Sequence, residues 1–331
     1  MKIILLSDVH IGLYSDSKIF HDVTINLFKE IVDTCERENI DHIFILGDYF
    51  HNRKNLNTKS MDAALQVADI ISTKNTVILV GNHDAYYKTN LIPNSLQIFK
   101  HHPNITIIDK ITQMEEFVLC PWGELPRGFH GGYCLGHFEL NGFHMNSGYI
   151  CNKGEDPKEL IYNDFDHIYS GHFHMPSTQG NITYLGAPFQ HNFSDVGQSR
   201  GYYIFDDGIV KFREFTNSPK FVKIHINDPK QELGEEIEGN VVRLIFKKDF
   251  GTVINEGIIN DVQRLKPLKM VNDFSNIKDE EVSEVGDTSI DLMDHSGIIE
   301  DFIEKHKVPE NVNKKTLIKM LMNFKKEIED E

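Results

Sequence analysis

The chain has 331 residues, 40% of them hydrophobic and 25% charged, which is ordinary for a globular protein with a catalytic domain and smaller appendages. No apolar stretch approaches a membrane-spanning length, and the four consecutive apolar residues at 3–6 are too few for a signal-peptide core. We therefore expect a soluble protein with no membrane partner. Four scattered cysteines fit reduced, buried side chains, which favours the cytoplasm.

The formal net charge is −16, from 34 basic and 50 acidic residues. Such a charge opposes broad electrostatic binding of nucleic acid. It does not exclude a focused cationic site, because bound divalent ions act as strong local positive charges. Composition alone leaves both interpretations open.

The first part of the chain alternates between strand and helix patterns. Short apolar runs at residues 3–6, 43–46 and 77–80 predict strands, and two stretches of helical period lie between them. The apolar faces of these stretches are Val23, Leu27, Phe28, Ile31, Val32 and Cys35, and then Met61, Ala64, Leu65, Ala68 and Ile71. The alternation predicts a parallel sheet with right-handed crossovers.

After residue 104 the predicted strands become short and turns become frequent. The strand-like runs are residues 105–108, 117–120, 133–135, 167–169, 182–185, 202–205 and 209–213, with a helical segment near 157–162. We expect a second sheet packed on the first, and one domain that spans residues 1–220.

The remaining chain predicts three appendages. Residues 221–273 contain two strand-like stretches and a helix-like stretch, which predict a small α+β domain, and residues 274–290 predict an acidic linker. Residues 291–331 recover a helical period. The apolar stripes there are Ile298, Ile299, Phe302 and Ile303, then Leu317, Leu321, Phe324 and Ile328. These helices either fold back onto the body or dock on a partner.

Five predicted strands end in polar clusters of metal-binding type. The clusters are Asp8-Val9-His10, Gly47-Asp48, Gly81-Asn82-His83-Asp84, Gly136-His137 and Gly171-His172-Phe173-His174. Open α/β sheets gather ligands at the carboxyl ends of their strands. Mixed carboxylate, imidazole and amide ligands suit manganese, iron or zinc better than magnesium, and seven ligands suit two ions that share a bridging carboxylate.

Together, these five motifs resemble the signatures of the calcineurin-like metallophosphoesterases. The resemblance implies an α/β fold, a four-layer αββα sandwich of two mixed sheets. It implies that one metal is held by Asp8, His10, Asp48 and His174, and that Asp48 bridges to a second metal held by Asn82, His137 and His172. His83 would be no ligand; it would stabilise the phosphate and protonate the leaving oxygen, with Asp84 orienting it from behind.

Finer detail narrows the resemblance to the SbcD-type DNA double-strand-break repair nucleases. Residues 47–54 read Gly-Asp-Tyr-Phe-His-Asn-Arg-Lys, unlike the matching segment of the protein phosphatases. In the repair nucleases the histidine that matches His51 positions the DNA phosphate, whereas the alternative for His51 is a solvated loop histidine. Residues 137–142 most resemble the compact nuclease subunits of T-even-type phages. The match covers about two thirds of the chain.

This resemblance implies a manganese-dependent DNA exonuclease and endonuclease, the catalytic subunit of a recombination or repair complex, acting by in-line attack of a metal-bridging hydroxide. By family architecture, residues 221–273 would be a reduced capping domain. Residues 291–331 would bind an SbcC-like ABC-type coiled-coil ATPase, which favours docking for the C-terminal helices. Family members often form homodimers.

Weak candidates for DNA contact are Arg53, Lys54, Lys88, Arg127 and Arg200, although isolated basic residues are usually only solvated.

Two other functions compete with this one. A phosphodiesterase of the same superfamily acting on small nucleotides would use the same ligands. A scaffold subunit that presents DNA to its ATPase is disfavoured, because a scaffold needs no metal ligands. If a phage encodes the chain, the expected location is the host cytoplasm.

Overall fold

The computed structural model describes residues 1–87, 89–146, 148–161 and 165–275. Nearly all of the predicted acidic linker, the C-terminal helices with their apolar stripes, and Lys88 lie outside these ranges. Residues 1–277 form one compact unit. None of the helices within the described ranges has the length and apolar character needed to cross a membrane.

Six of the described strands form the first sheet, in the order β14-β13-β1-β2-β3-β4. Their bounds are β1 Lys2–Leu6, β2 His42–Ile45, β3 Asn75–Leu79, β4 Ile105–Ile108, β13 Gly201–Asp206 and β14 Ile209–Glu214. Strands β1 to β4 are parallel, and β13 and β14 add an antiparallel edge. The parallel arrangement predicted for the first three strands is confirmed.

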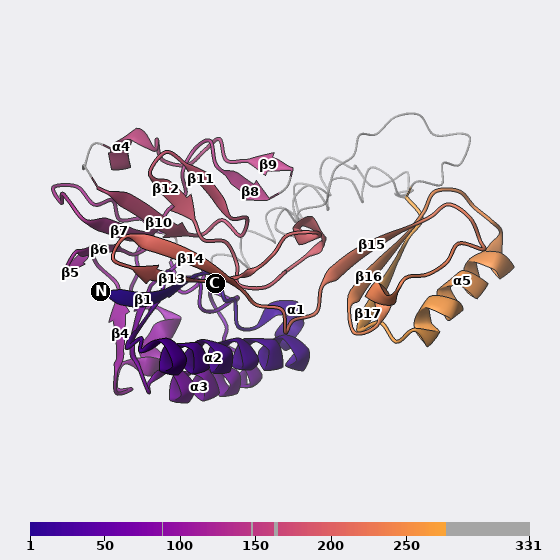
Figure 1. Cartoon of the computed structure of the whole chain (residues 1–331), viewed down its shortest axis with the longest axis horizontal. Helices are drawn as coiled ribbons and strands as arrows, with labels where there is room; N and C mark the ends of the chain where they lie inside the picture. The colour runs from indigo at the N-terminus through magenta and orange to yellow at the C-terminus, as the bar shows by residue number, and fades with distance from the viewer. Residues whose placement is uncertain (88, 147, 162–164, 276–331) are drawn as a thin grey trace, which may run out of the picture. The chain divides into compact units, whose positions relative to one another are not determined.

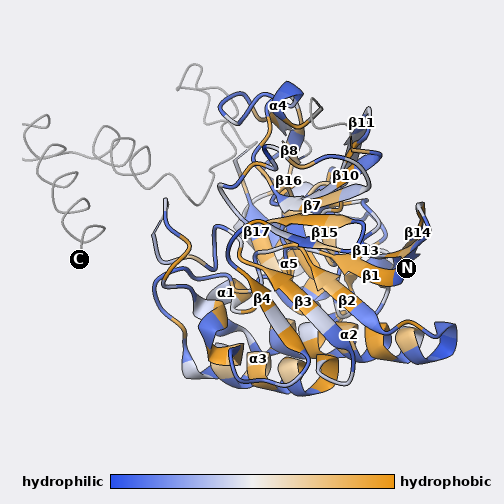
Figure 2. Ribbon diagram, turned by 90° about the vertical axis from the view of Figure 1, so that its left-hand side faces the viewer, coloured by the Kyte–Doolittle hydropathy of each residue, from blue (hydrophilic) through white to orange (hydrophobic). Residues whose placement is uncertain are grey.

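Two helices, α2 (Lys18–Glu38) and α3 (Thr58–Ile71), lie side by side on one face of this sheet (Figure 1). Figure 2 shows apolar residues concentrated on the strands and along parts of both helices. The predicted apolar face of α3 is partly wrong, because Met61 and Leu65 are 36% and 45% exposed while Ala63 and Val67 are buried. The alanines of α3 belong to the core that it forms with α2 and the sheet, and their small side chains permit close packing.

The second sheet has the order β11-β12-β10-β7-β6-β5 among the described residues. Its strands are β5 Thr112–Met114, β6 Phe117–Cys120, β7 Tyr133–His137, β10 His167–Gly171, β11 Ser177–Gln179 and β12 Ile182–Tyr184. An apolar core that includes Leu5, Phe44, Phe117 and Leu135 fills the space between the two sheets. The expected α/β sandwich of two mixed sheets is confirmed.

The outer layer on the second sheet is thin. Among the described residues it consists of α4 (Lys158–Ile161), the short hairpin of β8 (His144–Asn146) and β9 (Tyr149–Ile150), and loops. Phenylalanines from these loops, such as Phe143 and Phe165, cover the apolar outer face of the sheet. The fourth layer of the expected sandwich is therefore mostly loop.

Residues 221–273 form a small sheet of their own. Its parallel strands are β15 Phe221–Ile226, β16 Val241–Phe246 and β17 Lys269–Asp273, with α5 (Thr252–Arg264) connecting β16 to β17. Ile226, Leu244, Phe246 and Val262 belong to its separate apolar core. The two predicted strand-like stretches and the predicted helix are confirmed by β15, β16 and α5, whereas β17 was not predicted.

Aromatic contacts join this small sheet to the rest of the unit at α1 (Leu13–Asp16) and η2 (Phe193–Asp195). The Phe221 ring lies 6.1 Å from the Tyr14 ring and 5.1 Å from the Phe193 ring, measured between centroids. The guanidinium carbon of Arg243 lies 4.2 Å from the centre of the Phe193 ring. The Phe221 amide also donates a hydrogen bond to Oε1 of Gln190, at 2.7 Å. The remaining 3-10 turns are η1 Ser95–Phe99 and η3 Glu235–Ile237.

Candidate metal centre

The structure brings all seven predicted ligands together at the carboxyl ends of strands from both sheets. From the first sheet come Asp8 and His10 after β1, Asp48 after β2 and Asn82 after β3; from the second come His137 at the end of β7 and His172 and His174 after β10. Backbone hydrogen bonds continue the pairing of β1 and β2 into the ligand loops. The amide of Asp8 donates to the carbonyl of Gly47 at 3.1 Å, and that of His10 to the carbonyl of Asp48 at 3.0 Å.

The ligands form two groups that share Asp48. Its Oδ2 lies 3.6 Å from Nε2 of His10, and its Oδ1 lies 3.3 Å from Nε2 of His137. On the first side, Nε2 of His174 lies 3.0 Å from Nε2 of His10 and 4.0 Å from Oδ1 of Asp8. The Asp48 carboxylate therefore faces two separate sets of donors.

The second group is centred on Asn82. Its Oδ1 lies 3.0 Å from Nε2 of His137 and 2.9 Å from Nδ1 of His172. The Nδ1 of His137 lies 2.6 Å from the carbonyl oxygen of Leu46, and because a carbonyl can only accept, Nδ1 carries a proton. Once the ring is neutral, the lone pair of Nε2 is therefore directed at Asp48 and Asn82, which is the tautomer that a metal ligand needs.

Several ligands lie on strained backbone. Asp8, His10, Asp48 and His172 have φ angles of 56°, 53°, 52° and 89°, in the left-handed region that L-residues with side chains seldom adopt. Gly81 lies beside them, and a Cβ there would clash with the backbone and carboxylate of Asp48. The motif glycine at this position is therefore required by the close approach of two ligand loops.

These residues fit two divalent cations. Asp8 and Asp48 are buried carboxylates, which are costly without a compensating charge. The facing nitrogens of His10 and His174 are only 3.0 Å apart, so they can share at most one proton between them. The donor atoms of Asp8, His10 and Asp48 lie within 4.8 Å of one another, and so do those of Asp48, His137 and His172. A cation in each group would satisfy all of these donors.

Burial and mutual contacts shift the pKa of several ligands. Burial, followed by the charge of His137, lowers the pKa of His172 to about 3, and burial lowers that of His174 to about 4. Both are therefore neutral and able to coordinate at pH 7. Burial would also lower the pKa of His137, but the Asp48 and Asp8 carboxylates outweigh it and raise this pKa to about 9. Burial raises the pKa of Asp8 to about 7.

The catalytic candidates His83 and His51 lie beside the first ligand group. The His83 ring is 4.8 Å from the His10 ring and stacks on the His51 ring at 5.9 Å, measured between centroids. Nδ1 of His83 lies 2.7 Å from the backbone carbonyl oxygen of His51, so this nitrogen donates and Nε2 is the atom that can exchange a proton. His51 thus supports His83 through its main chain, and its side chain faces the site rather than only solvent.

Asp84 does not have the expected role. Its carboxylate accepts hydrogen bonds from the backbone amides of Gly81 at 2.9 Å, Phe50 at 2.9 Å and Tyr49 at 3.3 Å. In the described part of the chain, the group that contacts Nδ1 of His83 is the His51 carbonyl, not Asp84. The buried Asp84 therefore fastens the loop after β2 to the loop after β3, and it acts on His83 only through this backbone.

The predicted DNA contact at Arg200 is wrong. Arg200 is 3% exposed, and its guanidinium donates to Oδ1 of Asp195 at 2.6 Å, to Oε1 of Gln198 at 2.7 Å and to the carbonyl oxygen of His174. An arginine with these buried partners is not available for a phosphate. It supports the backbone of a predicted ligand instead.

The other basic candidates are spread around the site. Arg53 is half-buried, and its Nε donates to the carbonyl oxygen of Asn82 at 2.9 Å, so it also braces a ligand loop. Lys54 is exposed, and Arg127 is exposed with a guanidinium nitrogen 4.0 Å from a carboxylate oxygen of Glu159. Contact of these residues with DNA stays a prediction.

Sequence reasoning missed His191. This histidine is 3% exposed, and its ring lies 5.4 Å from the His10 ring and 5.0 Å from the His174 ring, measured between centroids. His191 stands six positions after the end of the strand-like run at residues 182–185, outside any of the five strand-end clusters. In the sequence, no second metal-binding residue type stands two positions from it, and it does not directly follow a predicted strand.

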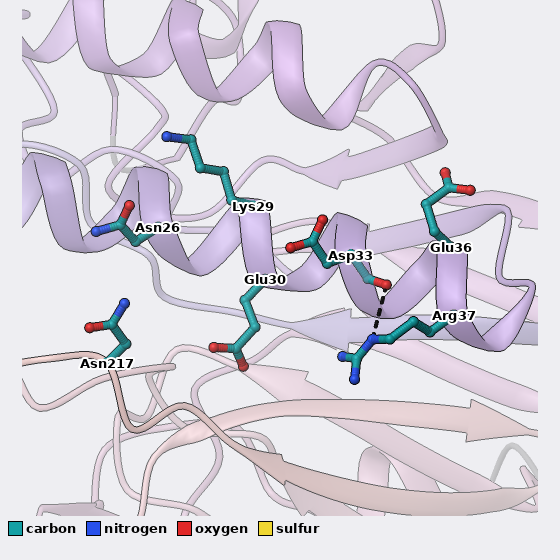
Figure 3. A pocket seen from close by; sticks show the side chains of 7 residues that line it. All are labelled: Asn26, Lys29, Glu30, Asp33, Glu36, Arg37 and Asn217. Atoms are coloured by element: carbon teal, nitrogen blue, oxygen red, sulfur yellow. Dashed lines mark hydrogen bonds between the residues drawn. The ribbon is translucent and has the colours of Figure 1, made fainter.

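Two surface hollows differ in their relation to the centre. One, of about 610 Å³, lies along α2 (Figure 3) and is lined by Asn26, Lys29, Glu30, Asp33, Glu36, Arg37 and Asn217, none of which is a predicted site residue. The other, of about 440 Å³, is lined in part by Trp122, Arg127, His137 and Lys153. The Trp122 ring lies 4.9 Å from the His172 ring. The second hollow therefore adjoins the ligand group of Asn82.

Binding of Mn²⁺ should release protons. His137, with a pKa of about 9, and Asp8, with a pKa of about 7, must both be deprotonated to coordinate. Affinity should therefore rise with pH and level off above pH 9, and proton release should fall from about two protons below pH 7 to about one near pH 8. Calorimetric titration in buffers of different ionisation enthalpy measures this number. A pH-independent affinity between pH 6 and pH 8 would contradict the assignment.

Replacement of Arg200 should destabilise the fold. Arg200→Ala removes the positive charge that pairs with the buried Asp195 carboxylate, and we expect the free energy of unfolding to fall by about 3–5 kcal/mol in urea denaturation. The control is Arg127→Ala, which removes an exposed arginine and should leave stability nearly unchanged. If Arg200→Ala kept full stability and instead weakened DNA binding, the structural role would be wrong.

Comparison with known proteins agrees with the site. The profile of the family described as calcineurin-like phosphoesterases matches residues 1–176. Exonuclease subunit 1 of Enterobacteria phage T4 is 26% identical over 323 residues, which cover 84% of this chain and 94% of that protein. The SbcD subunit of the nuclease SbcCD from Staphylococcus saprophyticus is 25% identical over 289 residues, which cover 75% of this chain and 74% of that protein.

Among solved structures, nuclease MPE of Pseudomonas putida aligns with a TM-score of 0.31 and 17% identity, over 63% of this chain and 86% of that chain. The resemblance inferred from the five motifs, including its SbcD-type character, is confirmed by the family profile and the two relatives. The chain belongs to the calcineurin-like phosphoesterase family.

Proposed function

We propose that this chain is the catalytic subunit of a DNA nuclease that hydrolyses phosphodiesters at a centre of two divalent ions. The observation that carries the proposal is the Asp48 carboxylate, whose oxygens face one donor group each, with His83 next to the first group. Two ions that share a carboxylate are typical of enzymes that displace groups at phosphorus. Both named relatives are nucleases, which supports nucleic acid as the substrate.

In this proposal Asp8, His10, Asp48 and His174 hold one ion, and Asp48, Asn82, His137 and His172 hold the other. When bound, such ions neutralise charge on the phosphate and activate water as a nucleophile. Manganese suits the mixed nitrogen and oxygen donors, and iron or zinc would suit them as well. Among these ions we propose manganese, because the repair-nuclease resemblance implies it, and metal dependence is part of the test.

His83 is the residue that we propose moves a proton. Its Nδ1 is held by the His51 carbonyl, so Nε2 faces a substrate with a fixed tautomer. An imidazolium there can donate a hydrogen bond to the phosphate and then give its proton to the leaving oxygen. His51, stacked on His83, is placed to orient the same phosphate.

The assay compares DNA with small phosphodiesters. Linear DNA, bis-p-nitrophenyl phosphate and cyclic nucleotides are each offered with Mn²⁺, Mg²⁺ or chelator. We expect cleavage of DNA with Mn²⁺, and His83→Ala should lower its rate by about 10²–10⁴-fold while Mn²⁺ binding changes little. His101→Ala, which alters an exposed histidine outside the centre, is the control. Cleavage of cyclic nucleotides but not of DNA would favour the small-nucleotide phosphodiesterase, and full activity of His83→Ala would refute the role of His83.

We also propose that the chain acts with a second subunit, an SbcC-like ATPase of the ABC type. Both relatives are named as subunits of nucleases, which supports an assembly. The ATPase-binding role predicted for residues 291–331 falls outside the described residues and stays a prediction. The nuclease assay with and without the cognate ATPase, and with a chain that ends at residue 290, tests this partner.

We further propose a homodimer through α2 and α3. Met61 and Leu65 are exposed apolar side chains one turn apart on α3, and Ile19 on α2 is also 39% exposed. Apolar side chains at successive turns of a helix commonly form an interface.

The charged substitution Leu65→Arg should shift the protein from dimer to monomer, measured by light scattering after size-exclusion chromatography. Gln66→Arg, which changes a neighbouring exposed polar residue, is the matched control and should leave the dimer in place. A wild-type protein that is monomeric at high concentration would contradict the proposed dimer.

A further inference from the structure

His191 lies against the first ligand group of the metal centre. Its ring is almost perpendicular to both neighbouring imidazoles, at 84° to His10 and 81° to His174. Each of the three histidines has one ring nitrogen that lies within 4.8 Å of a ring nitrogen of the other two. This limit is close to the separation of about 4.2 Å between two opposite ligands that each lie about 2.1 Å from one ion, so small movements of the rings would bring the three nitrogens to one ion.

Neither nitrogen of the His191 imidazole has a hydrogen-bond partner in the part of the chain that the structure describes. Within the described residues, Nδ1 and Nε2 of His191 are both buried and make no hydrogen bond, and Nδ1 of His10 shares this condition. Buried polar atoms in folded proteins nearly always have a partner, because an unpaired one loses its hydration without compensation. A buried ring with two unpaired nitrogens, one of which lies close to nitrogens of two candidate metal ligands, is suited to an ion.

The main chain around His191 is fixed on both sides. Its amide donates to Oδ2 of Asp195 at 2.8 Å, and its carbonyl accepts from the Tyr14 hydroxyl at 2.7 Å. Asp195 is paired with Arg200, and Arg200 also donates to the carbonyl oxygen of His174. One buried arginine therefore connects the peptide of a predicted ligand to the turn that carries His191. Such support is what holds metal ligands in position.

We propose that His191 is an additional nitrogen ligand of the ion that Asp8, His10, Asp48 and His174 would hold. This inference rests on the proposed two-ion centre. It makes the two positions chemically unequal, because the first would have three imidazoles and two carboxylates and the second two imidazoles, one amide and the shared carboxylate. Imidazole favours borderline transition ions over magnesium, so the first position is the more selective of the two.

The test is Mn²⁺ binding by calorimetry, which needs no substrate. The variant His191→Phe keeps an aromatic ring beside Phe189 and removes both nitrogens. We expect wild-type protein to bind two ions, and His191→Phe to bind one of them about 10–100-fold more weakly with the other little changed. His167→Phe is the matched control, because the Nε2 of His167 is paired with the Thr183 hydroxyl outside the centre; both ions should bind it normally.

Thermal unfolding separates a ligand from a structural residue. A ligand stabilises the folded chain only when the ion is present, so the metal-free melting temperature of His191→Phe should equal or exceed that of wild type, while the rise on adding Mn²⁺ should shrink. A lower melting temperature without metal and an unchanged rise with metal would overturn the proposal. His191→Gln provides a second variant if the phenylalanine is not tolerated.

Two other outcomes are decisive. If His191→Phe binds both ions like wild type but loses DNA cleavage, His191 acts on the substrate and the proposal is overturned, while the proposed function stands. If wild-type protein itself binds fewer than two ions, the two-ion centre is wrong, and this failure is distinguishable because it precedes any comparison of variants.

Discussion

The Asp48 carboxylate is the group on which the rest of the centre depends. It is 1% exposed and its two oxygens face different donor groups, so its negative charge must be balanced from both sides by protein groups or ions. The charge of His137, together with a hydrogen bond from it, outweighs the effect of burial and holds the pKa of Asp48 well below its usual value. Because it stays ionised, the Asp48 carboxylate can attract the donor groups on both of its sides. The backbone amide of His83 also donates to this carboxylate, at 2.9 Å.

Backbone strain accompanies this arrangement. Left-handed conformations at residues such as Asp8, His10 and Asp48 cost about 1–3 kcal/mol each, and they persist where neighbouring structure determines them. Here the determining contacts are the backbone hydrogen bonds between the loops after β1 and β2, and the amide of His172, which donates to Asp8 at 3.1 Å. The two sheets therefore stabilise conformations that the ligand segments would not adopt alone.

The sequence was informative wherever a regular pattern existed. Apolar runs identified the central strands because their side chains are buried on both faces, and the polar clusters at their ends located the ligands. Prediction failed where tertiary contacts determine the role or the burial of a side chain. Arg200 was expected at the surface, yet its partners come from an irregular loop and from the carbonyl of His174. Asp84 pairs with backbone amides, which leave no trace in a sequence. The face of α3 was misjudged because alanines fit an interior as well as an exterior pattern.

The contact between Gln190 and Phe221 links the small sheet of residues 221–273 to the loop beside the candidate metal centre. The amide of Phe221, the first residue of β15, donates to Oε1 of Gln190. The next residue, His191, accepts a hydrogen bond from the Tyr14 hydroxyl through its carbonyl, and the Tyr14 ring stacks on Phe221. A displacement of the small sheet would therefore disturb the peptide beside the first group of candidate ligands. By reciprocity of coupled equilibria, an ion bound there would restrain the small sheet by the same free energy with which displacement of that sheet loosens the ion. If the proposed ion is bound there, its affinity and the position of the small sheet are thus coupled through these contacts.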